Sequence, residues 1–493
     1  MANEICRRDF MVQAATATAL AAQVRAAAPA RRNIVFILID DMRFDSMGFM
    51  GHPFLETPHL DALAKNGKVF ENAFVTTSLC SPSRASILTG LYAHKHKVYD
   101  NKSPLDDAIP TFPRLLQEAG YRTGFIGKWH MNEVSSDSDK PRPGFDHWSS
   151  FRGQGVYVDP TFNINGTQQK LTGYITDLIT DQAVEFLNTS HEKPFCLYVS
   201  HKATHADFHP ADRHKGGYKD KTYPHPRSFD DTDENYAGKP AWVRAQRKSW
   251  HGVDGMYNKE TDFDTFTRDY CETMRAVDDS VGRIVATLKE QDLLDSTLLI
   301  FTGDNGFQFG EHGLIDKRTM YEASIRVPCI AHCPEFITAG SKCSELTLNL
   351  DFAPTFLEAA GVPVPPSMQG RSMMGLLHGE SPEWRDAFLY EYLWERSFPQ
   401  TPTILGVRTK QYKYIRYHGV WDYYELYDML KDPDEMNNLL AGYKQTSEGG
   451  IQESIIRAKA PEDVKKIFDG MAKRLQQLLD ETGCLQEPAW IGT

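Results

Sequence analysis

The chain has 493 residues, of which 41% are hydrophobic and 24% are charged, so we expect one large α/β domain and a smaller one rather than a single core. The formal net charge of −12 argues against nucleic acid as a partner, because phosphate binding requires a basic face. No apolar run reaches the roughly 18 residues of a membrane-spanning helix, so we expect no stable membrane insertion.

The N-terminus has the pattern of an export leader. Residues 7–11 (RRDFM) precede an Ala-rich stretch that ends in APA at residues 28–30. This pattern predicts a twin-arginine leader over residues 1–30 and a mature chain that begins near Arg31 in the bacterial periplasm or outside the cell. Arg25 departs from the pattern, and a disordered Ala-rich tail is the alternative.

The first predicted strand delivers two carboxylates. Asn33–Ile39 is a short continuous apolar run, typical of a buried parallel strand, and Asp40 and Asp41 follow it directly. Open α/β sheets bind their ligands at this edge. Thr57 and Pro58 then predict the start of a helix that ends at Gly67.

Cys80 lies between an apolar, β-leaning run (VFENAFVTT) and a predicted helix (SRASILTGL). A small nucleophilic residue at such a turn is well placed for chemistry on an anion, because the helix N-terminus offers free N–H groups. Arg84 follows four residues later, which places it on the same helix face as Cys80.

Two more predicted strands deliver basic side chains. A strand over Tyr121–Ile126 leads to Lys128 and His130, which an extended backbone would point to the same side. A strand over Lys193–Ser200 leads to His201 and His205.

A long polar segment at about residues 211–266 has no clear apolar period. Segments of this length inside a compact domain are usually functional or disordered. It contains Trp242 and Trp250, so we consider a glycan-binding lip, with a plain surface loop as the alternative.

The next strand delivers a second acidic pair. A helix with apolar residues from Tyr270 to Leu288 precedes a strand over Thr297–Phe301, and Asp304 and Asn305 follow that strand. The loop beyond them contains Glu311, His312, Lys317 and Arg318. An apolar strand at Val327–Ile330 and a helix over Asn349–Gly361 complete this part of the chain.

From about residue 376 the sequence becomes rich in Tyr and alternates in polarity, which predicts the antiparallel strands of a second domain. An amphipathic helix from Val464 to Leu478 closes it. We therefore expect a catalytic domain at 31–375 and an α+β domain at 376–493. The spacing of Cys329, Cys333 and Cys343 is compatible with one disulfide, although buried free thiols are favoured.

The strand-end residues form two chemical sets. Asp40, Asp41, Asp304 and Asn305 offer only hard oxygens, which suit Ca²⁺ or Mg²⁺ rather than zinc. The second set is cationic and complements a sulfate or phosphate ester. It consists of Arg84, Lys128, His130, His205 and Lys317.

These motifs resemble the type I sulfatases of the alkaline phosphatase-like superfamily. The family signature C-x-P-S-R followed by L-T-G is present at residues 80–90. The other family motifs follow the same order along the chain: paired acidic residues after the first strand (40–41), a G-K-x-H element (127–130), a histidine in HKATH (205), a D-N pair (304–305) before a lysine (317), and ELYD (425–428). The resemblance implies an α/β fold with a large mixed sheet flanked by helices and a smaller C-terminal antiparallel-sheet domain.

The resemblance also implies the chemistry. Cys80 would be converted to formylglycine (3-oxoalanine) by a maturation enzyme, and its hydrated aldehyde would attack sulfur beside one Ca²⁺ ion per chain. The metal ligands would be Asp40, Asp41, Asp304, Asn305 and residue 80 itself. In this scheme Arg84 keeps the nucleophile ionised, Lys128 bridges it to the substrate, His205 and Lys317 act on the leaving oxygen, and His130 takes the proton that reforms the aldehyde.

The finer pattern (GKWHMNE, PGFDHW, GQGVY, GEHGLIDKRTMYEASIRVP) looks similar to bacterial glycan sulfatases of the N-acetylglucosamine-6-sulfatase-like and mucin-desulfating types. Within this interpretation His201, His312 and Arg318 are candidate substrate contacts. Arg43 departs from the His or Gln of many relatives. A phosphoester or phosphonate monoester hydrolase of the same superfamily is the alternative, and a catalytically silent glycan-binding relative is a third reading.

Overall fold

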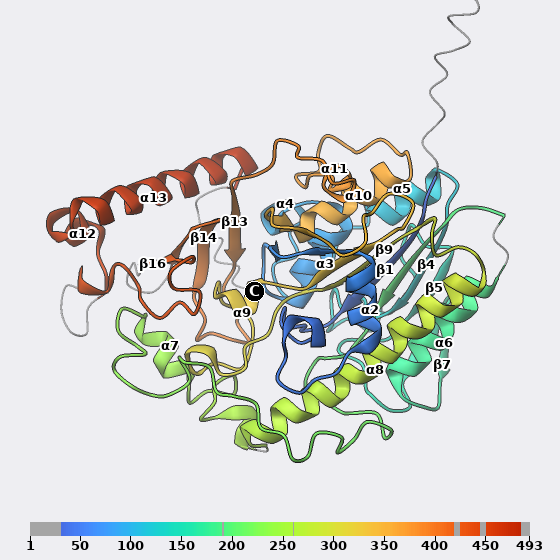
Figure 1. Ribbon diagram of the computed structural model, residues 1–493, viewed down its shortest axis with the longest axis horizontal. Coiled ribbons are helices and arrows are strands. Elements are labelled where there is room, and N and C mark those ends of the chain that lie inside the picture. Colours follow the sequence, from blue (N-terminus) through green and yellow to red (C-terminus); the bar gives the residue numbers. More distant parts are fainter. Residues whose placement is uncertain (1–30, 190–191, 260, 419–423, 444–449, 485–493) are drawn as a thin grey trace, which may run out of the picture.

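The computed structural model describes residues 31–189, 192–259, 261–418, 424–443 and 450–484. The predicted export leader at residues 1–30 lies outside these described residues. Two sheets organise the chain (Figure 1). The larger has ten strands in the order β11-β2-β10-β9-β1-β8-β4-β5-β6-β7, and the smaller has four in the order β13-β14-β15-β16. The outer strands of the larger sheet include β11 (Ser341–Cys343), β2 (Lys68–Phe70), β5 (His147–Ser150) and β7 (Thr167–Lys170).

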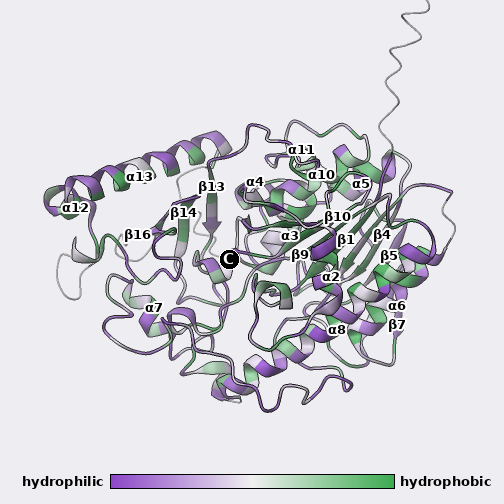
Figure 2. Cartoon of the chain, in the orientation of Figure 1, coloured by the Kyte–Doolittle hydropathy of each residue, from purple (hydrophilic) through white to green (hydrophobic). Residues whose placement is uncertain are grey.

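The large sheet is mixed, and its centre is parallel. Its four central strands are β9 (Thr297–Gly303), β1 (Asn33–Ile39), β8 (Phe195–Ser200) and β4 (Arg122–Gly127). A fifth parallel strand, β5, lies beside β4, and antiparallel strands follow on each side, β10 (Cys329–His332) beside β9 and β6 (Thr161–Ile164) beside β5. The apolar runs of the sequence thus form the buried centre of the sheet, as predicted (Figure 2).

Helices cover both faces of this sheet. Ile34, Phe36 and Leu38 of β1 point into one apolar cluster, and the alternate residues of the same strand point into the other. The first face carries α3 (Cys80–Thr89), α5 (Phe112–Glu118) and α10 (Phe352–Ala359), and the second carries α2 (Pro58–Asn66), α6 (Ile175–Asn188) and α8 (Phe263–Glu290). Each large apolar side chain buried in this way stabilises the fold by about 1.5–3 kcal/mol.

The smaller sheet is antiparallel, as its alternating Tyr-rich sequence predicted. Its strands are β13 (Ala387–Tyr392), β14 (Thr403–Thr409), β15 (Tyr412–His418) and β16 (Tyr424–Asp428). The closing helix α13 (Glu462–Thr482) packs on this sheet through Phe468, Met471 and Leu475. The domain boundary at residues 375 and 376 stays a prediction.

The structure confirms the predicted start of α2 and adds detail to the long polar segment. Thr57 stands at the N-cap of α2 with Pro58 at the first helical position, and the Thr57 hydroxyl donates to Asp61 Oδ1 at 2.8 Å instead of making a capping bond. The segment at 211–266 is largely irregular, yet it contains the short helix α7 (Ala241–Gln246) and carries Trp242 onto the ring of Tyr417 in β15. Trp242 therefore packs within the fold, whereas Trp250 remains 43% exposed.

The three cysteines with bridge-compatible spacing are thiols, so no disulfide links Cys329, Cys333 or Cys343. Within the described residues, we find no helix whose length and apolarity would let it cross a lipid bilayer.

The buried ring of His201 makes the stability of the fold depend on pH. Its ring is fully buried and Nε2 lies 3.0 Å from Ser280 Oγ on α8. Burial lowers the pKa of His201 to about 3, against about 6.5 in an unfolded chain. Between these values the unfolded chain binds the extra proton, so this residue's contribution to stability falls as the pH falls through that window, by about 1.4 kcal/mol per unit.

We expect His201→Gln to be less stable at pH 8 by about 1–3 kcal/mol, because it loses a buried hydrogen bond. The difference from the wild type should shrink as the pH is lowered from 6.5 towards 4. Urea unfolding at a series of pH values measures the free energy of unfolding of both proteins. A difference between them that does not change with pH would contradict the buried neutral imidazole.

Candidate active site

Strand register brings the predicted acidic residues together. Ile39 of β1 pairs with Gly303 of β9, so the residues that follow them, Asp40 and Asp304, leave the sheet side by side. Leu38 of β1 pairs with Ser200 of β8, and Ser200 pairs with Gly127 of β4. Four neighbouring parallel strands therefore deliver their polar residues to one edge, as the sequence predicted.

Gly127 shows how tightly this edge is packed. Its φ of +120° lies in the region that favours glycine, and a Cβ there would meet the carbonyl oxygen of Ser200 at 1.8 Å. No other residue fits this position without moving β8, and the placement of Lys128 depends on it.

Three carboxylates form the centre of the site. Oxygens of Asp40, Asp41 and Asp304 lie within 4.8 Å of one another, and each of these residues is at most 1% exposed. Burial, together with the charge of Asp40, raises the pKa of Asp304 to about 7. Burial likewise raises the pKa of Asp41. The charges of Lys128, His205 and Arg84 outweigh burial at Asp40 and hold its pKa well below the usual range.

Asn305 completes this cluster. Its Nδ2 donates to Asp41 Oδ1 at 2.7 Å, while its Oδ1 is buried without a hydrogen-bond partner. Buried polar atoms without partners are rare and call for an explanation. The cluster thus offers three carboxylates and one unpaired amide oxygen, a donor set that suits a hard divalent cation.

Cys80 faces the cluster from the first residue of α3. Its Sγ lies 3.5 Å from Asp40 Oδ1 and is fully buried. Burial, with the charge of Asp40 adding to it, raises the pKa of this thiol well above the ordinary value. The side chain at position 80 therefore points at the carboxylates from a helix N-terminus, as predicted.

The predicted cations surround the same carboxylates. Arg84 Nη2 lies 2.8 Å from Asp304 Oδ2 and 3.8 Å from Asp40 Oδ2. Lys317 Nζ donates to both oxygens of Asp41 at 2.6 and 2.5 Å. Lys128 Nζ donates to Asp40 Oδ2, and also to Gln154 Oε1 at 2.6 Å. Arg84 and Cys80 thus lie on one face of α3, as their spacing predicted.

The two predicted catalytic histidines approach from separate loops. His205 Nε2 is 3.8 Å from Asp41 Oδ2, and its ring keeps 17% of its exposure. His130 Nε2 lies 2.7 Å from Glu133 Oε2, and its buried Nδ1 has no hydrogen-bond partner. The backbone at His130 has a φ of +56°, so the expectation of an extended backbone there is wrong, although His130 still lies beside the site.

The three predicted sugar contacts, His201, His312 and Arg318, do not lie together in the structure. Arg318 donates from Nη1 to Asp316 Oδ2 and from Nε to Glu395 Oε1, both at 2.8 Å, and its guanidinium carbon lies 3.7 Å from the centre of the Phe398 ring. The ring of His251 stacks on the ring of Phe398, with 4.8 Å between the two ring centres. Arg318 directly follows Lys317 and therefore adjoins the carboxylate cluster.

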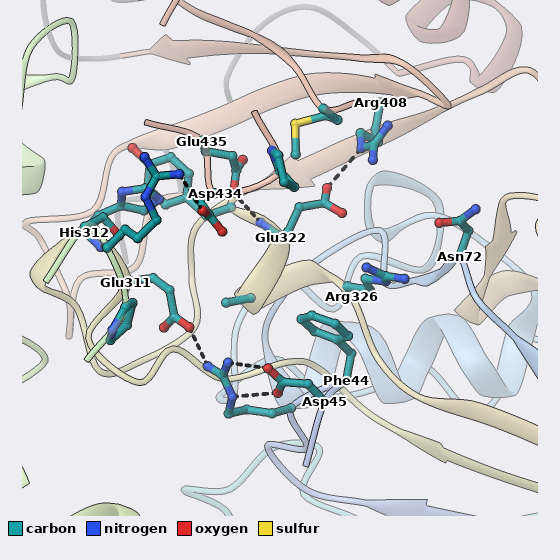
Figure 3. Close-up of a pocket in the computed structure, with 18 of the residues that line it drawn as sticks. Phe44, Asp45, Asn72, Glu311, His312, Glu322, Arg326, Arg408, Asp434 and Glu435 are labelled. Atoms are coloured by element: carbon teal, nitrogen blue, oxygen red, sulfur yellow. Dashed lines mark hydrogen bonds and ion pairs between the residues drawn. The ribbon is translucent and has the colours of Figure 1, made fainter. Parts of the chain in front are cut away.

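His201 and His312 do not join this group. His201 points to Ser280 within the core. His312 is 1% exposed, packs against the ring of Tyr321 at 4.1 Å, and lines a different cavity of about 500 Å³ between the large sheet's loops and the smaller sheet (Figure 3). None of the clustered carboxylates lines that cavity, whose walls carry the pairs Arg43–Asp45 and Glu322–Arg408.

Several residues of the site carry no signal that the sequence analysis used. Glu133 and Gln154 bond His130 and Lys128 from the loops after β4 and β5 (His147–Ser150). Glu395 and Phe398 come from the C-terminal part of the chain, just after β13. Glu133 and Gln154 lie within the segments GKWHMNE and GQGVY, but neither segment indicates that these residues bond His130 and Lys128.

Comparison with known proteins identifies the family of the chain. The sulfatase family model matches residues 32–362, and the model of the N-sulphoglucosamine sulphohydrolase C-terminal region matches residues 310–458. The N-acetylglucosamine-6-O-sulfatase of Bacteroides thetaiotaomicron is 36% identical over 467 residues, which cover 83% of this chain and 82% of that protein.

Solved structures extend the comparison. The structure of BT4656 in complex with its substrate D-glucosamine-2-N,6-O-disulfate is 33% identical, has a TM-score of 0.81, and matches 94% of this chain and 100% of the other. The phosphonate monoester hydrolase of Agrobacterium radiobacter is 22% identical with a TM-score of 0.74 over 92% of this chain and 96% of its own, so it shares the fold. With the family model spanning more than half of its length, this chain belongs to the sulfatase family.

Proposed function

We propose that this sulfatase hydrolyses the sulfate ester of a sulfated carbohydrate, with N-acetylglucosamine 6-sulfate as the first substrate to test. The observation that carries the proposal is the buried cluster of Asp40, Asp41 and Asp304 facing residue 80, with cations beside it. The relative that shares 36% of its residues is an N-acetylglucosamine-6-O-sulfatase, which supports the choice of sugar.

The donor set fits a resident Ca²⁺ ion. Asp40, Asp41 and Asp304 would hold it through carboxylate oxygens, and Asn305 would supply the amide oxygen that has no hydrogen-bond partner. Three crowded carboxylates are more stable with a divalent cation among them. When bound, the ion would polarise a sulfate oxygen.

Residue 80 fits the role of the nucleophile after conversion to formylglycine by a maturation enzyme. Its side chain faces Asp40 and starts α3, whose N-terminal end carries the positive pole of the helix dipole. The modified residue supplies a hydrated aldehyde as the attacking group.

The surrounding side chains take complementary roles in this proposal. Arg84 and Lys128 hold negative charge at the nucleophile and at the sulfate, because both already contact carboxylates of the cluster. The hydrogen bond from His130 Nε2 to Glu133 leaves Nδ1 free to accept a proton, which suits a base. His205 Nε2 and Lys317 act on the leaving sugar oxygen.

Sugar recognition falls to Arg318 and its partners. Asp316, Arg318 and Glu395 present fixed hydrogen-bonding groups beside Lys317, and Phe398 adds an aromatic surface. Exposed Trp250 adjoins this group through the ring of His251. The placements of His201 and His312 argue against the direct sugar contacts that the sequence suggested for them.

The decisive experiment compares kcat/KM on N-acetylglucosamine 6-sulfate, an aryl sulfate and an aryl phosphate. We expect the sulfated sugar to be the best of the three, since only a sugar leaving group would offer hydroxyls to Arg318, Asp316 and Glu395. A preference for aryl phosphate would instead assign the chain to the phosphoester or phosphonate hydrolases of the superfamily.

The protein for this experiment should come from its native host and be checked by peptide mass spectrometry. We expect residue 80 as formylglycine and a mature chain that begins near Arg31, because we propose export through the twin-arginine leader. Only unmodified Cys80 in active protein from that host would overturn the proposed nucleophile.

Metal content tests the carboxylate cluster separately. We expect one calcium ion per chain by elemental analysis, and its loss in Asp304→Asn, because this change removes an anionic ligand from the cluster. Asp316→Asn is the matched control, since Asp316 is also a buried carboxylate but pairs with Arg318 outside the cluster. Equal calcium in both variants would contradict the assigned ligands.

Arg318→Ala tests sugar recognition. Removing a charged donor that contacts the sugar should lower kcat/KM on the sulfated sugar by about 10- to 100-fold. Activity on a small aryl sulfate should change little, which also reports that the variant is folded. A parallel loss on both substrates would place Arg318 in the chemical step or in folding rather than in selectivity.

A further inference from the structure

A second group of metal-ligating side chains lies where the end of α13 meets α4 (Ala93–His96) (Figure 1). It consists of His94 from α4, Glu391 from β13 and Cys484 just beyond α13, and ligand atoms of the three lie within 4.8 Å of one another. It shares no residue with the carboxylate cluster. Its nitrogen, oxygen and sulfur atoms form a donor set of a different chemical kind.

The spacing of these atoms is close to that of a tetrahedral site. His94 Nδ1 lies 2.9 Å from Glu391 Oε2, and Cys484 Sγ lies 3.9 Å from the same oxygen. Around a tetrahedral Zn²⁺ the corresponding separations would be about 3.3 and 3.5 Å, given its usual bond lengths. The two separations from Glu391 Oε2 therefore differ from those of a tetrahedral site by only a few tenths of an ångström, and the third pair of atoms lies within 4.8 Å.

The second nitrogen of His94 is held in the manner of a metal ligand. Nε2 lies 3.0 Å from the carbonyl oxygen of Thr482. A metal-binding imidazole usually donates its other N–H to a carbonyl or carboxylate, which fixes the ring and the tautomer. This bond turns Nδ1 towards Glu391 and Cys484.

Cys484 is fixed by the end of its helix. Gly483 adopts a φ of +66° and its N–H bonds Asp480 O at 3.1 Å, while the N–H of Cys484 bonds Leu479 O at 2.8 Å. This is the Schellman arrangement of a helix C-terminus. It aims the thiol at Glu391 from the end of a helix of 21 residues, where the helix dipole favours a cation.

Glu391 supplies a buried negative charge. It is 2% exposed, and in the described part of the chain it pairs with the ring of His94 at 2.9 Å rather than with a lysine or arginine. Its Oε1 accepts the backbone N–H of His94 at 3.0 Å, which holds the carboxylate in place. Lys95, the lysine of α4, donates from Nζ to Gly483 O at 3.2 Å and so contacts the end of α13.

We propose that His94, Glu391 and Cys484 bind a borderline divalent cation of the Zn²⁺ class, through imidazole nitrogen, carboxylate oxygen and thiolate sulfur, with water as the fourth ligand. The bound ion fastens the last turn of α13 and strand β13 to α4, the helix that follows the nucleophile helix α3. This site goes beyond the proposed function and does not depend on it.

Cobalt binding tests the site directly. The full-length chain is prepared in a Cys80→Ala background, which removes the thiol beside the carboxylate cluster, and is freed of metal with a chelator. We expect Co²⁺ to produce the near-ultraviolet charge-transfer band of a cobalt–thiolate bond, and Zn²⁺ to displace it. The same addition of Zn²⁺ should raise the melting temperature, because a ligand of the folded state stabilises it.

The variant Cys484→Ser should lose both the band and the zinc-dependent rise in melting temperature, and His94→Asn should weaken both. Cys343→Ser is the matched control, because Cys343 is also a partly exposed thiol but has no place in the cluster, and it should keep both. Absence of the band in the Cys80→Ala protein, or its persistence in Cys484→Ser, would overturn the proposal.

Discussion

The buried balance of charge at the edge of the large sheet is the constraint on which the rest of the structure depends. Asp40, Asp41 and Asp304 are almost fully buried, and a buried carboxylate is tolerated only when opposite charge and hydrogen bonds compensate for lost water. Arg84, Lys128 and Lys317 provide that compensation. Removing one of them would weaken this compensation in the interior, so these residues serve folding and chemistry together.

The residues at this edge of the sheet could be predicted from the sequence, because the geometry of parallel strands determines where they lie. Continuous apolar runs identify parallel strands, parallel strands end at one edge, and polar residues after them must therefore meet. The strands at Asn33–Ile39 and Thr297–Gly303 and the cluster at Asp40, Asp41 and Asp304 follow from this rule. The register of β1 and β9 then supplies the detail that no pattern in the sequence carries.

The rest depends on contacts between distant segments, which periodicity does not encode. Glu395 reaches Arg318 across 77 positions, and nothing in either stretch marks the other as its partner. His201 and His205 come from one short histidine-rich segment, yet His201 turns into the core against Ser280 and His205 turns to Asp41. A positive φ at His130 likewise replaced the expected extended backbone. Backbone turns in loops decide such outcomes, and they follow from tertiary packing.

The polypeptide just before and after β13 is tied to the large domain at several points. Arg385 bonds Asp351 at 2.5 and 2.6 Å, Glu391 bonds the backbone and ring of His94, and Glu395 bonds Arg318. Breaking one buried ionic contact of this kind costs about 3–5 kcal/mol, so a swinging motion of the smaller sheet away from the larger one would be rare on the timescale of turnover. Substrate entry and product release would then depend on side-chain and loop motions rather than on separation of the two sheets.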